Sequence, residues 1–500
     1  MPKNLGKCFD ATRDPEKIVL IEPRDFIAPR FTTYTELDRE CDALARGLLA
    51  RGYKRGDRIG ILSANTREML CAYLGIMRAG MVAVPFSYKL NRDTLAHIVA
   101  DSEMVAIFHD RSRRAMCPDG PALLDLGDHD AYSSLLDFGP FETVEPAARE
   151  LAMILYTSGS TGRPKGVLLS HESQYWALER GARLYGDRSD HRYIVAAPIF
   201  HMNATISIKS ALFANASIVL LPTFSAVDYA KAIDRFKVTS LTSVPTMLAM
   251  VARERDTLGN LDFTSVSDVM MGSAPLTQAL VDKIQSIFPA ARITNSYGTT
   301  EAGPSPFGPH PDGIPRPAVS VGYPAPDAGC ELRESDDPNQ GVLYMRSPML
   351  MEGYNNLPEK TAEVMRDGWY RSGDIMRRDE NGFFYFLGRA DDMFNVGGEN
   401  VWPGEVEKLV ETMPGVHQAC VVPVPHELKD MVPFAFIVLK PGADITETDV
   451  KDYTIANGPA YAHPRHVAFI EEIPLAGTNK PDRTLLKARA RQIADNAGNV

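Results

Sequence analysis

Residues 155–166, LYTSGSTGRPKG, gather four serine and threonine side chains and three glycines around one lysine, Lys165. The spacing differs from that of the commonest phosphate loop, G-x-x-x-x-G-K-[ST], because two residues separate Gly162 from Lys165 and a glycine follows the lysine. The apolar runs LAMILY (151–156) and GVLLS (166–170) predict a strand on each side. A flexible Gly/Ser connector is the alternative, but such linkers rarely lie between two buried runs.

The composition of this stretch suits a loop that holds phosphate. Glycines let main-chain N–H groups come close to an anion, hydroxyl side chains donate hydrogen bonds, and the lysine supplies a compact positive charge. The residues predicted to contact phosphate are Thr157, Ser158, Gly159, Ser160, Thr161, Gly162 and Lys165.

Outside the loop, strand and helix patterns alternate along the chain. Thr33 and Glu36 form a capping-box pair ahead of an apolar stripe at helical spacing. The alternation over 58–108 and 217–245 indicates parallel sheets covered by helices. The predicted strands are RIGIL (58–62), MVAVPF (81–86), MVAIF (104–108), SIVLLP (217–222) and VTSLTSVP (238–245), and the predicted helices are 66–80, 92–102 and 227–237.

The last third of the chain has a different pattern. From about residue 320 to 400, short β-like segments are broken by turns. Beyond residue 400, a helix at 404–415 and strands at 416–425 and 434–440 indicate a small α+β unit. A chain of 500 residues is expected to form two or three domains.

Composition narrows the class of protein. The formal net charge of −11 argues against non-specific binding to nucleic acid or anionic lipid. The six cysteines show no C-x-x-C spacing, which argues against a zinc site and a dithiol motif and favours buried thiols. No apolar run suits a signal peptide or approaches the ~20 residues of a membrane span, so a cytoplasmic protein is expected.

The stretch YTSGSTGRPKG resembles the phosphate-binding signature of the adenylate-forming superfamily, which includes acyl-CoA synthetases, adenylation domains and firefly-type luciferases. Four further signatures of that family follow in its order along the chain. They are NSYGTTE (295–301), GWYRSGD (368–374), GRADD (388–392) and GTNKPDR (477–483). The resemblance therefore covers essentially the whole chain and is specific.

The resemblance implies an α/β fold with two domains. A large N-terminal domain, residues 1–390, would contain helix-covered, mainly parallel sheets and a β-rich subdomain, and would bind AMP and the acyl group. A small, mobile α+β C-terminal domain, residues 391–500, would carry the catalytic lysine. Asp391 resembles the family's hinge residue, about which this domain swings.

The resemblance also assigns roles on the nucleotide side. Glu301 is implied as the Mg²⁺ ligand, Thr300 as a phosphate contact and Tyr297 as a flat face for adenine. Asp374 is implied to bind the ribose hydroxyls, and Arg389 to reach ribose or phosphate; the alternative for both is a surface ion pair. The remaining implied nucleotide contacts are Gly272, Ser273, Ala274, Asn295, Ser296, Gly298 and Thr299.

Lys480 is implied as the catalytic lysine, which contacts the carboxylate and the α-phosphate in the first step and then leaves. Taken alone, a lysine near a C-terminus is more often solvated. Asn479 occupies the position at which the family usually has glycine. Asn tolerates positive φ better than other non-glycine residues, so the turn is expected to survive.

The acyl and CoA sides are less legible. APIFHMNATISI (197–208) resembles the segment that gates the carboxylate pocket, with His201 as the gate; a core histidine is the alternative. The apolar character of this segment suits a medium-chain or aryl acid. Lys209 interrupts the segment and is expected to extend to the surface, with selection of a second carboxylate as the alternative. Gly397 and Gly398 resemble the glycines that line a pantetheine tunnel.

These signatures predict an AMP-forming acyl-CoA synthetase that uses ATP, Mg²⁺ and CoA on a small carboxylic acid. Neither nucleic acid nor a membrane span is expected, and a homodimer is one option for the assembly. Three alternatives remain: transfer of the acyl group to a carrier protein or another nucleophile, a phosphate-loop enzyme that makes ADP, and a non-catalytic nucleotide-binding relative.

Overall fold

The computed structural model describes residues 3–157, 163–259, 261–274, 276–304, 306–396, 399–426, 429–475 and 481–496. By its internal contacts the chain divides into two compact units. The larger unit comprises residues 1–330 and 344–371, and the smaller unit comprises residues 331–343 and 372–500. The predicted boundary after residue 390 was drawn where a mobile C-terminal domain is expected to begin. It stays a prediction.

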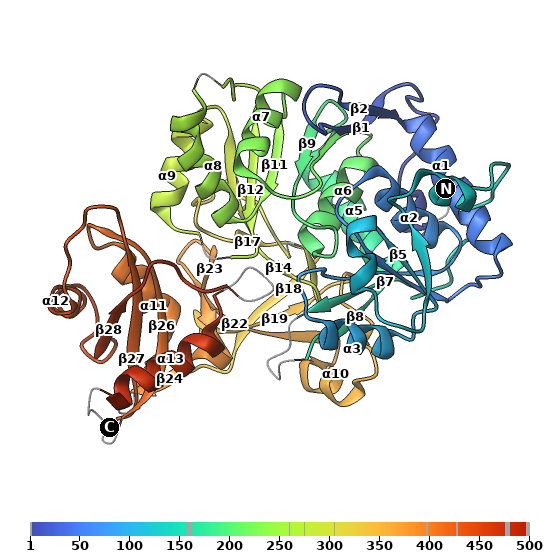
Figure 1. Ribbon diagram of the computed structural model, residues 1–500. Coiled ribbons are helices and arrows are strands. Elements are labelled where there is room, and N and C mark those ends of the chain that lie inside the picture. The colour runs from blue at the N-terminus through green and yellow to red at the C-terminus, as the bar shows by residue number, and fades with distance from the viewer. Residues whose placement is uncertain are drawn as a thin grey trace. The chain divides into compact units, whose positions relative to one another are not determined.

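Two seven-stranded sheets form the framework of the larger unit (Figure 1). Sheet A has the order β13-β12-β11-β9-β10-β1-β2, and its neighbours are parallel except for β1 and β2. Its strands are β1 (Ile18–Glu22), β2 (Arg30–Thr33), β9 (Arg192–Val195), β10 (Ser217–Leu220), β11 (Ser240–Ser243), β12 (Asp268–Gly272) and β13 (Arg292–Ser296).

Sheet B has the order β20-β8-β7-β4-β3-β5-β6, with β8 antiparallel to both β7 and β20 and the rest parallel. The antiparallel β7–β8 pair frames the predicted phosphate loop, as its apolar flanks indicate. The strands of sheet B are β3 (Arg58–Leu62), β4 (Val82–Pro85), β5 (Ala106–His109), β6 (Ala122–Asp125), β7 (Leu151–Thr157), β8 (Lys165–Ser170) and β20 (Gly353–Tyr354).

Helices cover these sheets in layers. Helices α7, α8 and α9 share one buried apolar cluster with sheet A, and α3 packs its leucine and isoleucine side chains on sheet B. Helix α1 packs on α2, and α5 packs on α6. The helices of this unit are α1 (Tyr34–Ala50), α2 (Arg67–Arg78), α3 (Arg92–Ser102), α4 (His129–Leu135), α5 (His171–Tyr185), α6 (Met202–Phe213), α7 (Ala226–Phe236), α8 (Pro245–Leu258), α9 (Gln278–Ile287) and α10 (Pro358–Val364).

Several short strands lie outside sheets A and B. The hairpins are β14 (Gly298–Thr299) with β15 (Gly303–Pro304), and β16 (Phe307–Gly308) with β17 (Tyr323–Pro324). A five-stranded sheet has the order β18-β19-β22-β21, with β23 paired to β22. Its strands are β18 (Gly329–Arg333), β19 (Gln340–Arg346), β21 (Met365–Arg366), β22 (Trp369–Arg378) and β23 (Phe384–Arg389).

The smaller unit also contains a second sheet packed against helices, with its own apolar core. This sheet has the order β25-β24-β27-β26, and β28 pairs in parallel with β27. Its elements are β24 (Phe394–Val396), β25 (Glu399–Val401), α11 (Pro403–Glu411), β26 (Val416–His426), β27 (Asp430–Leu439), α12 (Glu447–Asn457), β28 (His466–Phe469) and α13 (Arg483–Asn496). The predicted α+β character of the region beyond residue 400 is confirmed.

Local sequence signals account for many of these elements. Thr33 caps α1 with its hydroxyl while the Glu36 side chain accepts from the Thr33 N–H at 2.8 Å, so the predicted capping box is present.

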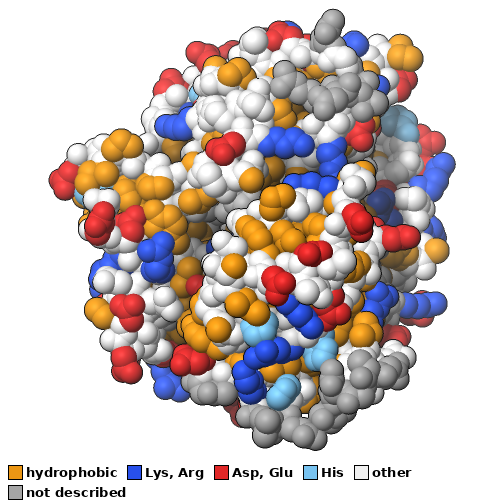
Figure 2. All heavy atoms as spheres, turned by 90° about the vertical axis from the view of Figure 1, so that its left-hand side faces the viewer, with side chains coloured by type: hydrophobic (Ala, Val, Ile, Leu, Met, Phe, Trp, Pro, Cys, Tyr) orange, Lys and Arg blue, Asp and Glu red, His pale blue; other side chains and the backbone are white. Residues whose placement is uncertain are grey.

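All six cysteines lie in described segments and are free thiols, five of them buried. On the face shown in Figure 2, acidic, basic and apolar side chains are interspersed.

Lys209 does not extend to the surface as expected. It lies two turns into α6, is fully buried, and its ammonium donates to Gln174 Oε1 of α5 at 3.3 Å. The expectation was wrong because α5 packs along α6 and covers this position. Burial lowers the pKa of Lys209 from its ordinary value of 10.5 to about 7, although Cys8 opposes the shift.

We predict that Lys209→Met alters the pH dependence of stability. Between pH 7 and 10.5 the unfolded chain binds more protons at Lys209 than the folded one, so the wild-type free energy of unfolding rises with pH in this window. Methionine removes this contribution, which amounts to up to about 5 kcal/mol. Urea unfolding between pH 7 and 9 should show a shallower rise for the variant. Lys231→Met, at an exposed lysine of α7, should keep the wild-type slope, and equal slopes in all three proteins would refute the prediction.

Candidate active site

The carboxyl ends of parallel strands in sheet A bring several predicted site residues to one edge. His201 follows β9, Gly272 ends β12 and Ser296 ends β13. Strands β9, β11, β12 and β13 are successive parallel neighbours, so the segments that follow them emerge on the same side. Ligands of open α/β sheets bind at this edge.

The strand ends of β12 and β13 lie unusually close together. Gly272 faces Ser296 in the register, and a Cβ at Gly272 would lie 2.4 Å from Ser296 Oγ. Ser296 donates to the Met271 carbonyl at 3.1 Å, and Ser273 takes a left-handed φ of 65°. Ala274 comes next in the chain. Only a glycine fits at position 272, so main chain rather than side chain lines this point of the edge.

The NSYGTTE segment is fixed from its first residue. The Asn295 amide donates to the Val319 carbonyl at 2.8 Å, and Arg316 donates to the Asn295 carbonyl. Burial lowers the pKa of Arg316 to about 10. The half-buried Tyr297 ring packs edge-on against Phe307, with centroids 5.9 Å apart. The aromatic face expected for adenine is therefore supported by a second ring.

The start of the phosphate loop carries a buried hydroxyl. Thr157 is the last residue of β7, and its Oγ1 is buried without a hydrogen-bond partner among the described residues. Lys165, the first residue of β8, pairs with it across the strands, and its ammonium lies 4.4 Å from the ring centroid of Tyr354. Ser158, Gly159, Ser160, Thr161 and Gly162 lie outside the described residues.

Glu301 is held at both its main chain and its side chain. It lies in the turn between β14 and β15, next to Thr300 and close to Gly298. In the same turn, Thr299 Oγ1 accepts from the Ala302 N–H at 3.0 Å. The Glu301 carbonyl accepts from the Met351 N–H at 2.7 Å, and its Oε1 accepts from the Tyr354 hydroxyl at 2.9 Å.

The donor set fits a magnesium ion bound together with nucleotide. Within the described ranges, no group of three or more His, Cys, Asp or Glu side chains could hold a metal ion. Mg²⁺ is usually bound through one or two carboxylates together with substrate phosphates and waters, not by an all-protein cage. A single placed carboxylate, Glu301, suits this mode of binding.

His201 lies immediately before the first turn of α6. It is the N-cap residue, with φ −105° and ψ 141°, and its ring packs edge-on against Phe200 at a centroid distance of 4.6 Å. Phe200 in turn contacts Tyr88 at 5.5 Å. The half-buried imidazole thus stands at the end of an aromatic row at the carboxyl edge of sheet A.

In the smaller unit, Arg389 links two carboxylates. Its Nη1 donates to Asp374 Oδ1 at 2.9 Å and its Nη2 to Asp391 Oδ2 at 3.1 Å. Burial opposes the charge, but the two carboxylates raise the pKa of Arg389 above its ordinary value. The Asp374 side chain is 9% exposed and that of Asp391 is 52% exposed. The Asp374 carboxylate is thus buried, whereas the Arg389–Asp391 pair is exposed, and the ribose roles of Asp374 and Arg389 stay predictions.

Three further predicted site residues also fall outside the described residues. They are Lys480, Gly397 and Gly398, and their roles stay predictions.

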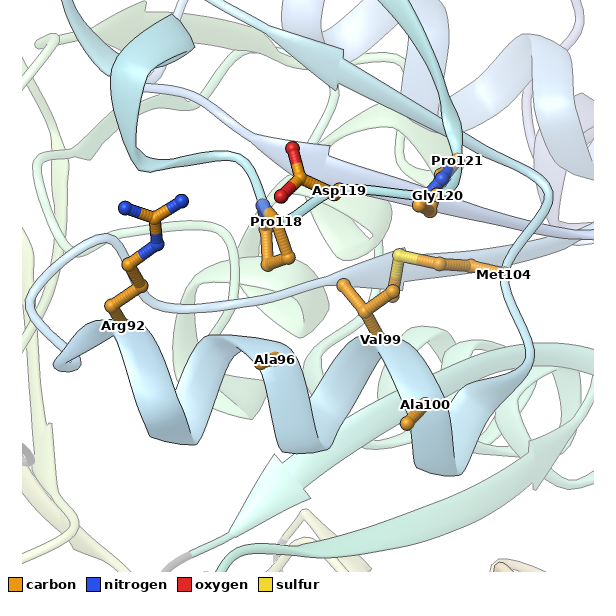
Figure 3. A pocket seen from close by; sticks show the side chains of 9 residues that line it. All are labelled: Arg92, Ala96, Val99, Ala100, Met104, Pro118, Asp119, Gly120 and Pro121. Carbon is orange, nitrogen blue, oxygen red and sulfur yellow. The ribbon is translucent and has the colours of Figure 1, made fainter.

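A separate hollow of about 490 Å³ lies beside α3 (Figure 3). Its apolar wall includes Val99 and Met104, with Arg92 and Asp119 at its rim. Another flank of the same helix faces the phosphate-loop strands. There His97 contacts Pro164, and Asp101 contacts the β7 residue Tyr156. None of the predicted site residues that the structure describes lines this hollow.

Sequence reasoning missed Tyr354, which contacts both Glu301 and Lys165. The sequence offers only a Gly-Tyr pair (353–354) there, and nothing local connects Tyr354 to Glu301, which lies 53 positions earlier. Arg316 was also missed, since nothing in its Pro-rich surroundings signals a functional role.

Parallel sheets with loops at their carboxyl edge, and a loop flanked by hydroxyl and lysine side chains, define a nucleotide-binding α/β enzyme. The chain belongs to the AMP-binding enzyme family, because the family's sequence profile matches residues 9–355 and the profile of the AMP-binding enzyme C-terminal domain matches residues 405–480. The expected superfamily and its α/β fold with a separate C-terminal domain are confirmed.

Relatives of known name agree with this assignment. A feruloyl-CoA synthase from Amycolatopsis sp is 30% identical over 470 residues, which cover 92% of this chain and 93% of the relative. A fatty acid–[acyl-carrier-protein] ligase from Streptomyces coeruleorubidus is 30% identical over 480 residues, 92% of each chain. The crystal structure of ATP-bound MatB from Rhodopseudomonas palustris superposes with a TM-score of 0.88 at 28% identity and covers 99% of this chain and 100% of that one.

None of the helices in the described segments is long and apolar enough to cross a membrane.

We predict that Gly373→Ala disrupts the arginine pair. Gly373 has φ 70°, and an added Cβ would lie 2.9 Å from Arg389 Nη2. Gly368→Ala is the matched control, because Gly368 has φ 75° but its nearest neighbour would be Arg346 Cδ at 3.8 Å. Both variants should lose about 1 kcal/mol of stability from left-handed strain. Only Gly373→Ala should also weaken AMP binding, by about tenfold in calorimetry; equal AMP affinities in the two variants would contradict the assignment.

Proposed function

We propose that this chain is an AMP-forming acyl-CoA synthetase. A substrate carboxylate oxygen attacks the α-phosphorus of ATP, the bond to the bridging oxygen breaks, and pyrophosphate leaves with its electron pair. The CoA thiol then loses its proton to solvent, its sulfur attacks the acyl carbon, and AMP leaves with the oxygen that joined phosphorus to the acyl carbon. The observation that carries the proposal is the Thr157 hydroxyl, which is buried without a hydrogen-bond partner among the described residues and lies across the strand pair from Lys165. The ring of Tyr354 lies against the Lys165 ammonium, and its hydroxyl donates to Glu301. The family includes a relative named as a feruloyl-CoA synthase.

The described residues divide the work on the nucleotide. Thr157 and Lys165 hold the departing phosphates, since a hydroxyl and an ammonium both donate to phosphate oxygens. Glu301 would hold Mg²⁺, which supplies positive charge where two anions approach each other. Tyr297 offers its ring to adenine, and Asp374 offers acceptor oxygens to the ribose hydroxyls while Arg389 fixes its orientation.

Lys480 carries the proposed chemistry of the first step. Its ammonium screens the charges of the incoming carboxylate and the α-phosphate, and residues 391–500 then turn about Asp391 to admit CoA past Gly397 and Gly398. This division of labour gives the two half-reactions different requirements.

We predict that Lys480→Ala abolishes adenylate formation, with a loss of at least about 100-fold in acid-dependent pyrophosphate release. The variant should still convert preformed acyl-adenylate and CoA to the thioester at close to the wild-type rate. Lys487→Ala, seven positions later, is the control and should retain both half-reactions. Equal losses of both half-reactions in Lys480→Ala would refute the proposed role.

The acid is proposed to be hydrophobic, either medium-chain or aryl. After His201, residues of α6 such as Ala204 and Ile208 are buried and apolar, which favours an apolar pocket wall. A panel of short, medium-chain, aromatic and dicarboxylic acids, scored by pyrophosphate release, identifies the class. Highest activity on a short dicarboxylic acid would overturn this part of the proposal.

A second acceptor is supported by one relative, the fatty acid–[acyl-carrier-protein] ligase. In that case the same adenylate would be transferred to the phosphopantetheine thiol of a carrier protein. Thioester formation with CoA alone favours the synthetase, whereas pyrophosphate release without transfer to CoA favours the carrier ligase. We further propose that the enzyme acts in the cytoplasm and forms a homodimer. Light scattering in solution would test the homodimer.

A further inference from the structure

Tyr354 occupies a position that joins two parts of the proposed site. It is the second residue of β20, where it faces Val167 of β8, and it is 5% exposed. Its N–H donates to Thr361 Oγ1 at 2.9 Å, and the Asn355 N–H donates to the Gly166 carbonyl at 2.7 Å. The backbone around Tyr354 is therefore bound to the strand that begins with Lys165.

The two ends of the side chain hold groups of opposite charge. The hydroxyl donates to Glu301 Oε1 at 2.9 Å, and the ring face lies under the Lys165 ammonium at 4.4 Å from its centroid. A carboxylate keeps lone pairs beyond one such bond, so the contact orients Glu301 without exhausting its capacity as a ligand. The ring attracts the ammonium through its negative face.

A further set of bonds anchors this arrangement to α3. Asn355 Nδ2 donates to the Asp101 carbonyl at 2.7 Å and to Asp101 Oδ2 at 3.1 Å. The same Oδ2 accepts from the Tyr156 hydroxyl at 2.6 Å. Because Tyr156 precedes Thr157, both flanks of the phosphate loop and the tyrosine share one anchor, Asp101.

We propose that Tyr354 is a positioning residue for the metal–nucleotide complex. Its hydroxyl holds Glu301 in the orientation that binds Mg²⁺ with ATP, and its ring keeps Lys165 directed to phosphate and away from the carboxylate. When one side chain supplies the protein's share of the metal site, its orientation has a large effect on affinity. This inference rests on the proposed function and adds to it the residue that prepares the metal ligand.

Two variants separate the roles of the hydroxyl and the ring. Tyr354→Phe keeps the ring under Lys165 and removes only the bond to Glu301. Tyr354→Leu removes both the bond to Glu301 and the ring under Lys165. Tyr385→Phe is the matched control, because Tyr385 donates to Asp379 Oδ2 at 2.8 Å in the smaller unit. Thermal unfolding of each variant establishes that it folds.

Calorimetry measures ATP binding with Mg²⁺ and in EDTA. In Tyr354→Phe, the gain in ATP affinity on adding Mg²⁺ should fall by about tenfold, while binding in EDTA stays within about twofold of wild type. Tyr354→Leu should lose affinity in EDTA as well, and Tyr385→Phe should match wild type in both. A full Mg²⁺ gain in Tyr354→Phe, or an equal loss in EDTA, would overturn the proposal.

The half-reactions give a second readout. Tyr354→Phe should require more Mg²⁺ for half-maximal pyrophosphate release, whereas thioester formation from preformed acyl-adenylate should be unchanged. Equal losses in both steps would indicate a purely structural role and overturn the proposal. If the wild type releases no acid-dependent pyrophosphate, the proposed function fails, while the calorimetric comparison still decides the role of Tyr354.

Discussion

The parallel arrangement of strands in sheet A is the constraint on which the nucleotide side of the larger unit depends. Parallel neighbours end at the same edge, so segments from residues 201, 272 and 296 meet there although they are far apart in the chain. The close approach of Gly272 to Ser296 shows how tightly this edge is built. In sheet B the phosphate loop joins two antiparallel neighbours, β7 and β8. The strand after the loop therefore runs back beside the strand before it.

Several of the arginines in this protein are held against carboxylates. Arg78 is fully buried and pairs with Asp38 and Asp42, and Arg389 joins Asp374 and Asp391. Glu301 and Lys165 follow another pattern, because an uncharged tyrosine engages each of them at a different atom. Such a contact orients a charge but leaves it available to a charged ligand, which a salt bridge would not.

Much of the fold was predictable from the sequence, because periodic apolar residues and caps act locally. The capping box at Thr33, the strands around the loop and the alternation over 58–108 all have signals within a few residues. The placement of Lys209 was not predictable, since a lysine in an apolar run looks the same whether or not another helix covers it. The contact of Tyr354 with Glu301 depends on the pairing of β20 with β8, which no local pattern encodes. Lys480, Gly397 and Gly398 were assigned by resemblance and stay predictions.

The burial of Lys209 has a chemical consequence for an enzyme that makes acyl-adenylates. A mixed anhydride acylates uncharged amines, and most lysines escape because they are protonated near neutral pH. With a pKa of about 7, Lys209 is in large part a free amine under these conditions and so would be a competent nucleophile. The same packing that removes its proton also leaves it 0% exposed. The core of the enzyme thus keeps this amine away from the enzyme's own reactive intermediate.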